Sequence, residues 1–188
     1  MNIGKTDIMG CIEIPAIDVN LPVYHYMTEE VLKKGAGHLF GSSLPVGGEN
    51  VHSVISAHRG LPEAKLFTDL NLLEEGDVFY ITVLAEKLAY EVDLIQVVEP
   101  SETEALGIEP GKDYVTLVTC TPYAVNTHRL LVRGKRIEYT EEVYAEQKAK
   151  TGFRNSPAVW PNVLCVLTGI GIAVLFVKIL SVRKRDKK

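Results

Sequence analysis

Three side chains capable of covalent chemistry stand at predicted strand ends. Cys120 is the last residue of the run YVTLVTC, and Arg129 begins the run RLLVRGKRI after the eight residues TPYAVNTH. If these two strands lie side by side, the end of the first and the beginning of the second fall at the same end of a sheet, so Cys120 and Arg129 would be neighbours. His58 ends a third run, VHSVISAH, just before an Arg-Gly reversal, and such loop positions often carry catalytic groups.

A thiol, an imidazole and a guanidinium together suit nucleophilic acyl transfer. The Cys120 thiolate would attack a carbonyl and form a thioester. The His58 imidazole would carry protons to the leaving amine and from the incoming nucleophile. The Arg129 guanidinium would stabilise the developing oxyanion or hold the substrate backbone. A plainer interpretation also stays open, in which Cys120 is a small buried hydrophobic residue and Arg129 is a surface charge.

The other histidines and cysteines receive no chemical role. His52 lies inside a strand run and is expected to be structural. Cys11 and Cys165 are far from each other in sequence and belong to no CxxC pair, which argues against a disulfide framework and against a structural zinc site. Loop or polar surroundings without an evident partner hold three more histidines: His25, His38 and His128.

Length and composition bound the class of protein. The 188 residues suit one domain of about 150 residues plus an appendage. With 46% hydrophobic and 23% charged residues, the chain is not disordered, collagen-like or a coiled coil. A net charge of −4 gives no general electrostatic case for nucleic-acid binding. Residues 178–188 hold six Lys or Arg and one Asp, so an acidic body precedes a basic tail.

The part of the chain before residue 139 is predicted to be mostly strands. Short helices are predicted in TEEVLKKGA, where Thr28 precedes two glutamates, and in PEAKLFTDL, where Pro62 suits a first turn. Seven or eight strands at this spacing favour a closed barrel or a sandwich. The strand runs, several with period-two alternation, are GCIEIP, NLPVYH, VHSVISAH, DVFYITVL, AYEVDLIQVVEP, YVTLVTC and RLLVRGKRI.

The C-terminal segment has the pattern of a membrane anchor. The stretch AVWPNVLCVLTGIGIAVLFV is uncharged and long enough for a helix to cross a bilayer, with Trp160 at the interface position. The basic tail after it predicts a cytoplasmic C-terminus and an exterior position for residues 1–155. A buried core helix is the alternative. The first residues lack the apolar region of a signal peptide. We therefore expect either that the true start of the protein lies upstream of Met1 or that the protein is tail-anchored with a cytoplasmic domain.

Two longer segments resemble a known family. TLVTC followed by eight residues and Arg129, with SAHRGLP upstream, resembles the sortases of Gram-positive bacteria. HLFGSSLPVGGENVHSVISAHRGLPEAKLFTDL and KDYVTLVTCTPYAVNTHRLLVRGKRI resemble class C, the pilin-polymerising sortases. The resemblance covers about residues 8–138 and extends to the C-terminal membrane helix of that class. The TLxTC pattern alone is moderately specific, whereas the ordered set of His58, Cys120 and Arg129 is strong.

The resemblance implies a mainly β fold, the eight-stranded sortase-type β-barrel with short helices, plus a C-terminal transmembrane helix. The chain would then divide into a catalytic barrel over residues 1–138 and a polar linker over 139–156. A transmembrane helix over 157–180 and a basic cytoplasmic tail over 181–188 would follow. The catalytic domain would be extracellular and held at the cell membrane by this single C-terminal pass.

The resemblance also implies a reaction. Cys120 would cleave the Thr–Gly bond of an LPXTG-like sorting signal, with His58 as general acid and base and Arg129 as the oxyanion or substrate stabiliser. Thr119 would shape the oxyanion site or contact the substrate. A Lys amine of another pilin subunit would resolve the acyl-enzyme and give an isopeptide bond. The implied partners are pilin or surface-protein sorting signals and the membrane; no metal, organic cofactor or nucleic acid is implied.

The sequence departs from the class at two places, and three other functions stay open. The lid segment with an Asp-aromatic motif, usual before the barrel in class C, is not found before Gly10, and Ala124 stands where Gly is expected. The alternatives are a sortase that anchors surface proteins to peptidoglycan, a non-catalytic truncated membrane-tethered barrel, and a general cysteine hydrolase. The last is disfavoured because no papain-like signature surrounds Cys120.

Overall fold

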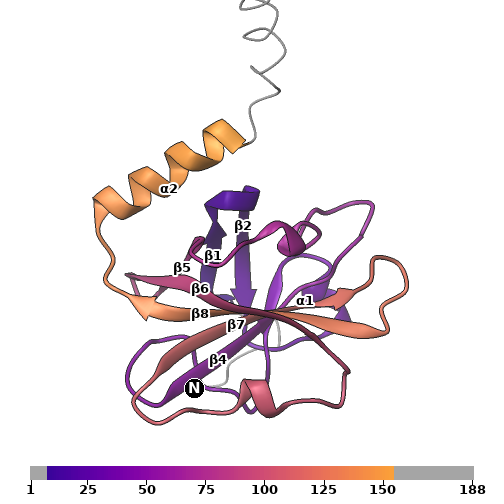
Figure 1. Cartoon of the computed structure of the whole chain (residues 1–188). Coiled ribbons are helices and arrows are strands. Elements are labelled where there is room, and N and C mark those ends of the chain that lie inside the picture. The colour runs from indigo at the N-terminus through magenta and orange to yellow at the C-terminus, as the bar shows by residue number, and fades with distance from the viewer. Residues whose placement is uncertain (1–7, 155–188) are drawn as a thin grey trace, which may run out of the picture. The chain divides into compact units, whose positions relative to one another are not determined.

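The computed structural model describes residues 8–154, which form a closed barrel followed by a helix (Figure 1). Eight strands pair in the order β1-β2-β3-β4-β7-β8-β6-β5, and β5 pairs with β1 to close the ring. The expected mainly β, eight-stranded barrel is therefore confirmed. The strands are β1 (Ile8–Ile14), β2 (Val19–Tyr24), β3 (Ala36–His38), β4 (Val51–Ser56), β5 (Val78–Val83), β6 (Glu86–Val98), β7 (Asp113–Thr121) and β8 (His128–Ile137).

Strand alternation divides the side chains of β7 and β8 between the barrel interior and an outer face. Val115 and Leu117 of β7 point into the core and meet Leu130 and Val132 of β8, all almost fully buried. The intervening residues of both strands point outward. On β7 these outward residues are mostly apolar or Thr, so the sequence shows no clean polar alternation there, whereas on β8 they include the charged Arg129 and Arg133.

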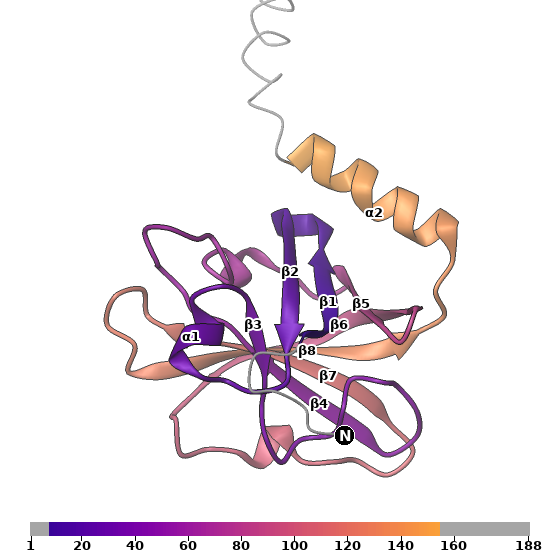
Figure 2. The same cartoon turned by 180° about the vertical axis from the view of Figure 1, so that it is seen from behind.

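The strand β4 joins β7 in parallel, and this pairing brings distant parts of the chain together. The register runs from Val51 opposite Asp113 to Ser56 opposite Val118, so the two strands end side by side. Parallel neighbours need a crossover connection, which here includes β5 and β6. Figure 2 shows the opposite side of the barrel, where β1, β2 and β3 lie together next to α1.

Of the two predicted short helices, the one in TEEVLKKGA is present, and the prediction of the one in PEAKLFTDL is wrong. In α1 (Glu29–Leu32), the Thr28 hydroxyl accepts a hydrogen bond from the Val31 amide at 3.3 Å, as the sequence indicates. The segment PEAKLFTDL is instead a series of turns leading to a 3-10 helix, Leu70–Leu72. Leu66 has φ of 41°, and the Phe67 amide donates to the His58 carbonyl rather than to a helical partner. Tertiary bonds thus replace the helix.

The segment predicted as a polar linker over 139–156 contains α2 (Glu141–Arg154). The contacts within the chain divide it into two units, Met1–Thr151 and Gly152–Lys188, and the barrel belongs to the first. Across residues 8–154, no helix is both long and apolar enough to cross a membrane. The predicted anchor at 157–180, the basic tail and Cys165 lie outside the described residues.

A lysine enclosed by tyrosines joins α2 to the barrel. Lys87 Nζ lies 3.6 Å from the ring centroid of Tyr144 and 5.0 Å from that of Tyr80, and it is 3.1 Å from Glu13 Oε2. The Tyr144 hydroxyl donates to Glu13 Oε1 at 2.7 Å. The helix is therefore held to the barrel by the Glu13 carboxylate of β1, the Lys87 ammonium of β6 and an edge-to-face contact between the Tyr144 and Tyr80 rings.

We expect Glu13→Gln to lower the melting temperature at neutral pH and to lose this effect in acid. Burial by itself raises the pKa of Glu13, but hydrogen bonds from Tyr144 and Lys87 and attraction by Lys87 and Lys148 outweigh it, so its pKa lies below the ordinary value. Such a carboxylate stabilises the folded state above its unfolded pKa of about 4.3, and the contribution disappears as pH falls through the folded pKa.

Thermal unfolding of the two proteins checks this pH dependence. At neutral pH the variant should lose about 1 kcal/mol of stability, whereas at about pH 3 the two melting temperatures should converge. Glu91→Gln is the matched control, because Glu91 pairs with Lys135 at 3.1 Å on a more exposed surface and should cost less. A Glu13→Gln deficit that persists unchanged in acid would contradict the assignment.

Candidate active site

Cys120 and Arg129 lie directly opposite each other on neighbouring antiparallel strands. They are Cα partners in the register of β7 and β8, followed by Thr121 opposite His128 at the end of the ladder. The expected juxtaposition of the two strand ends is thus confirmed. Because directly opposite residues place their side chains on the same face, the thiol and the guanidinium both project to the outer face of the barrel.

The segment that carries His58 is fixed against the end of β7. The Ala57 amide donates to the Val118 carbonyl at 3.2 Å, and the Thr119 hydroxyl donates to the Ala57 carbonyl at 2.9 Å. The His58 carbonyl accepts from Phe67 at 3.1 Å. The first two bonds hold Ala57 beside Val118 and Thr119, the two residues that precede Cys120. The third fixes the backbone of His58 itself.

Thr119 itself points into the barrel and is 1% exposed. Its hydroxyl is engaged by the Ala57 carbonyl, which gives it a role in positioning the His58 segment. A direct contact with substrate or oxyanion stays a prediction. The bond explains why a hydroxyl residue is useful immediately before Cys120: it ties two strand ends together without occupying the outer face.

The loop after Cys120 orients the Arg129 guanidinium. Nη1 of Arg129 donates to the carbonyls of Asn126 and His128, at 3.2 and 3.0 Å. Within residues 8–154, its Nε and Nη2 groups make no hydrogen bond and remain as donors for a ligand. Ala124 has φ of 64°, in the left-handed region that favours glycine. A glycine at position 124 would adopt this φ without strain, as expected from the class. The effect of Ala124 is therefore backbone strain in the loop after Cys120.

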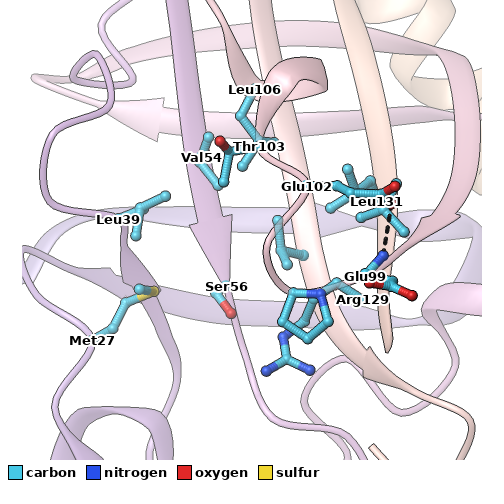
Figure 3. Close-up of a pocket in the computed structure, with 13 residues that line it drawn as sticks. Met27, Leu39, Val54, Ser56, Glu99, Glu102, Thr103, Leu106, Arg129 and Leu131 are labelled. Carbon is cyan, nitrogen blue, oxygen red and sulfur yellow. Dashed lines mark hydrogen bonds between the residues drawn. The ribbon is translucent and has the colours of Figure 1, made fainter. Parts of the chain in front are cut away.

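A cavity of about 250 Å³ extends along the outer face from Arg129 (Figure 3). Its floor is the outer face of three strands, with Val54 and Ser56 from β4, Val118 from β7 and Leu131 from β8. Cys120 follows Val118 on the same face of β7 and lies opposite Arg129; it does not itself line the cavity, which it adjoins through these two lining residues. The cavity walls are mostly apolar, and the guanidinium supplies a cation at one end.

The connection from β6 to β7 forms the roof of the cavity. It contributes Glu99, Thr103 and Leu106, and in Figure 3 Glu99 is drawn close to Arg129 while Thr103 and Leu106 lie further along the cavity. His52 of β4 holds the roof from below: its Nδ1–H donates to the Gly107 carbonyl at 2.7 Å. The irregular sequence of this connection gave no signal that it lines a binding site.

His52 is structural, as expected from its position inside a strand. It is 1% exposed, and its Nε2 lies 2.7 Å from the Thr116 hydroxyl. Burial lowers the pKa of His52 below its ordinary value, and the positive Arg133 lowers it further against the opposing Gly107 hydrogen bond. The neutral ring can then donate from one nitrogen and accept from Thr116 with the other.

The three remaining histidines lie in different surroundings, and the expectation that none of them is catalytic stays a prediction. His38 is buried, and its Nε2 donates to the Ser43 carbonyl at 2.9 Å. His25 stacks on Tyr26. His128 is paired with Thr121 at the end of the β7–β8 ladder, and its Nδ1 lies 2.9 Å from the Thr127 hydroxyl.

Comparison with known proteins identifies the family. Residues 12–137 match the model of the sortase domain. Sortase A from Streptococcus agalactiae is 33% identical over 139 residues, which is 72% of this chain and 55% of that protein. The chain belongs to the sortase family.

Solved structures of sortase C support the assignment to class C. Sortase C1 from Streptococcus suis is 59% identical, with a TM-score of 0.71 over 72% of this chain and 76% of that one. Sortase C from Clostridium perfringens, solved with a C-terminal cell wall sorting motif, is 56% identical, with a TM-score of 0.70 over 73% of this chain and 75% of that one. The chain spans little more than half of the curated sortase A from Streptococcus agalactiae.

Proposed function

We propose that this chain is a cysteine transpeptidase that joins pilin subunits. It would cleave an LPXTG-like sorting signal between Thr and Gly and transfer the new acyl group to a Lys amine of another pilin. The observation that carries the proposal is the pairing of Cys120 with Arg129, which lines a mostly apolar cavity. The related sortase C solved with a sorting motif supports the same substrate class.

The first half of the reaction forms an acyl-enzyme. The Cys120 sulfur attacks the Thr carbonyl carbon, and the oxygen gains negative charge that the free N–H groups of Arg129 can stabilise. The C–N bond then breaks as His58 gives a proton to the Gly nitrogen, and the new amino terminus leaves. The product is a thioester between Cys120 and the Thr carbonyl.

The second half consumes a lysine amine. A neutral Lys amine attacks the thioester carbonyl, His58 accepts the proton that the nitrogen loses, and the C–S bond breaks to return the Cys120 thiolate. The resulting isopeptide bond joins the Thr of one subunit to the Lys of the next. Water competes for the same thioester, so the amine must be favoured by positioning and by exclusion of water.

The apolar cavity suits the N-terminal Leu-Pro pair of the sorting signal. Leu39, Val54 and Leu106 offer hydrophobic walls, and a volume of about 250 Å³ accommodates a few side chains rather than a folded partner. A Leu-Pro pair laid along the strands would place the following Thr toward the Arg129 end. The sorting signal would thus be bound by its apolar residues and cleaved where the thiol stands.

Incubation of the protein with purified pilin tests the proposal. We expect a ladder of covalent multimers that survives boiling in detergent. A pilin whose acceptor Lys is replaced by Arg should still be cleaved but should give no ladder. Transfer to short cell-wall amines without any pilin ladder would favour the peptidoglycan-anchoring function instead, and absence of both cleavage and transfer would contradict the transpeptidase assignment.

A further inference from the structure

Arg59, the residue after His58, connects three separate segments around the site. Its Nε donates to the Thr68 carbonyl at 3.1 Å, its Nη1 to the Thr121 hydroxyl at 3.1 Å, and its Nη2 to Asn71 Oδ1 at 2.7 Å. Each arm of the planar guanidinium is therefore used, and the acceptors lie in the turn after His58 and immediately after Cys120.

The bond to Thr121 is the only one of the three that crosses between the two loops. Thr121 directly follows Cys120, and Arg59 directly follows His58, so one hydrogen bond spans the chain positions adjacent to both reactive residues. The bonds to Thr68 and Asn71 anchor the same guanidinium to the other side of the His58 loop. The Arg59 guanidinium and these three hydrogen bonds, which we call the brace, thus link the His58 loop to the residue after Cys120.

The loop contact around this brace is close. Gly60 has φ of 80°, and a Cβ at this position would come within 2.7 Å of the Tyr123 ring. The Tyr123 ring also lies 6.0 Å from the Arg59 guanidinium carbon. The HRG turn and the loop after Cys120 thus touch through an aromatic ring as well as through the hydrogen bond.

We propose that Arg59 is a positioning residue that sets the approach of the His58 imidazole to the Cys120 thiol by tying the His58 loop to Thr121. The inference deepens the proposed function, because a proton-transfer pair is needed only if Cys120 is the nucleophile. Lysine keeps the charge but has no planar fork with three separated donor directions, so it cannot replace the brace. Displacement of a catalytic group by about 1 Å can cost about 100-fold in rate.

A double-mutant cycle on the free protein tests whether Arg59 acts through His58. In a background with Cys11→Ser and Cys165→Ser, we measure the rate of Cys120 alkylation by iodoacetamide. His58→Ala should change this rate by at least about fivefold when Arg59 is present and by less than about twofold when Arg59→Ala is already made. An equal His58→Ala effect in both backgrounds, or none in either, overturns the inference.

Milder variants distinguish a loss of positioning from simple unfolding of the protein. Thr121→Val removes one end of the brace and should reduce the His58 effect in the same direction, and Arg59→Lys should not restore it. Arg133→Gln is the matched control: Arg133 makes two hydrogen bonds to Asp93 and one to Glu109, so its loss should lower the melting temperature and leave the cycle unchanged. Full restoration by Arg59→Lys would contradict the geometric role.

Cleavage of a sorting peptide separates this inference from the proposed function. If the native protein alkylates with the expected coupling but does not cleave any LPXTG-like peptide, the proposed function fails and the Arg59 role stands. If it cleaves the peptide but the coupling is absent, the role of Arg59 fails alone. For an active enzyme, Arg59→Ala should lower kcat by about 10- to 100-fold with a much smaller change in KM, since Arg59 is not among the residues that line the cavity.

Discussion

Replacing Cys120 with alanine should abolish the covalent acyl-enzyme and lower cleavage of a sorting peptide by at least about 1,000-fold, because no other group in the arrangement replaces the sulfur nucleophile. Intact-mass measurement after incubation with the peptide provides the readout: the native chain should gain the mass of the acyl fragment and the variant should not. The fold should be retained, since the half-buried thiol is not part of the core.

Cys11→Ala is the control for that result. Cys11 lies in β1, opposite Pro22 and Thr82, and belongs to a different part of the ring from β7. Its replacement should leave the adduct and the cleavage rate unchanged, and the same is expected of Cys165→Ala. Loss of the adduct in Cys11→Ala with retention in Cys120→Ala would show that the nucleophile has been assigned to the wrong thiol.

Arg129→Lys should reduce the rate of acyl-enzyme formation by about 100-fold even though it keeps the positive charge. The Arg129 guanidinium is held by two loop carbonyls through Nη1 while its other N–H groups stay available, an arrangement that an ammonium on a flexible chain cannot reproduce. Loss of one oxyanion donor typically costs about 100- to 1,000-fold in kcat. Single-turnover kinetics with the sorting peptide would measure the effect on the first half of the reaction.

Arg136→Lys is the matched control at the other end of β8. Arg136 pairs with Asp113 at 3.7 Å and lies near the Tyr90 ring, far along the strand from Arg129. Its replacement should alter stability slightly and acyl transfer not at all. Near-native single-turnover rates for Arg129→Lys would mean that charge alone is sufficient and that the oriented donors are not used.

Local patterns predicted the parts of the site that depend on consecutive strands. The neighbours Cys120 and Arg129 have only eight residues between them, and an antiparallel pair brings such residues together without any distant contact. The capped turn at Thr28 was equally local. The eight-stranded barrel itself followed from the family resemblance, with the short strand β3 left unassigned because three residues give no periodic signal.

The remaining features depend on contacts between distant segments. The segment that carries His58 is placed beside the end of β7 by the parallel pairing of β4 with β7, about 60 positions later in the chain, and no local pattern encodes that pairing. The three acceptors of Arg59 and the roof formed by the β6–β7 connection are of the same kind. The predicted helix over 62–70 failed for the same reason, since its backbone serves the His58 loop instead.

The closed ring restricts how an extended peptide can be recognised. Among the described strands, each one pairs with a neighbour on both sides over part of its length, so unpaired backbone is confined to stretches such as the end of β6, which pairs with β8 alone. Recognition of a linear peptide would then rely mainly on side-chain pockets and loops. Sequence preference in such a protein can therefore diverge by changing the β6–β7 connection and the loop after β7, while the ring of strands that aligns the reactive residues stays as it is.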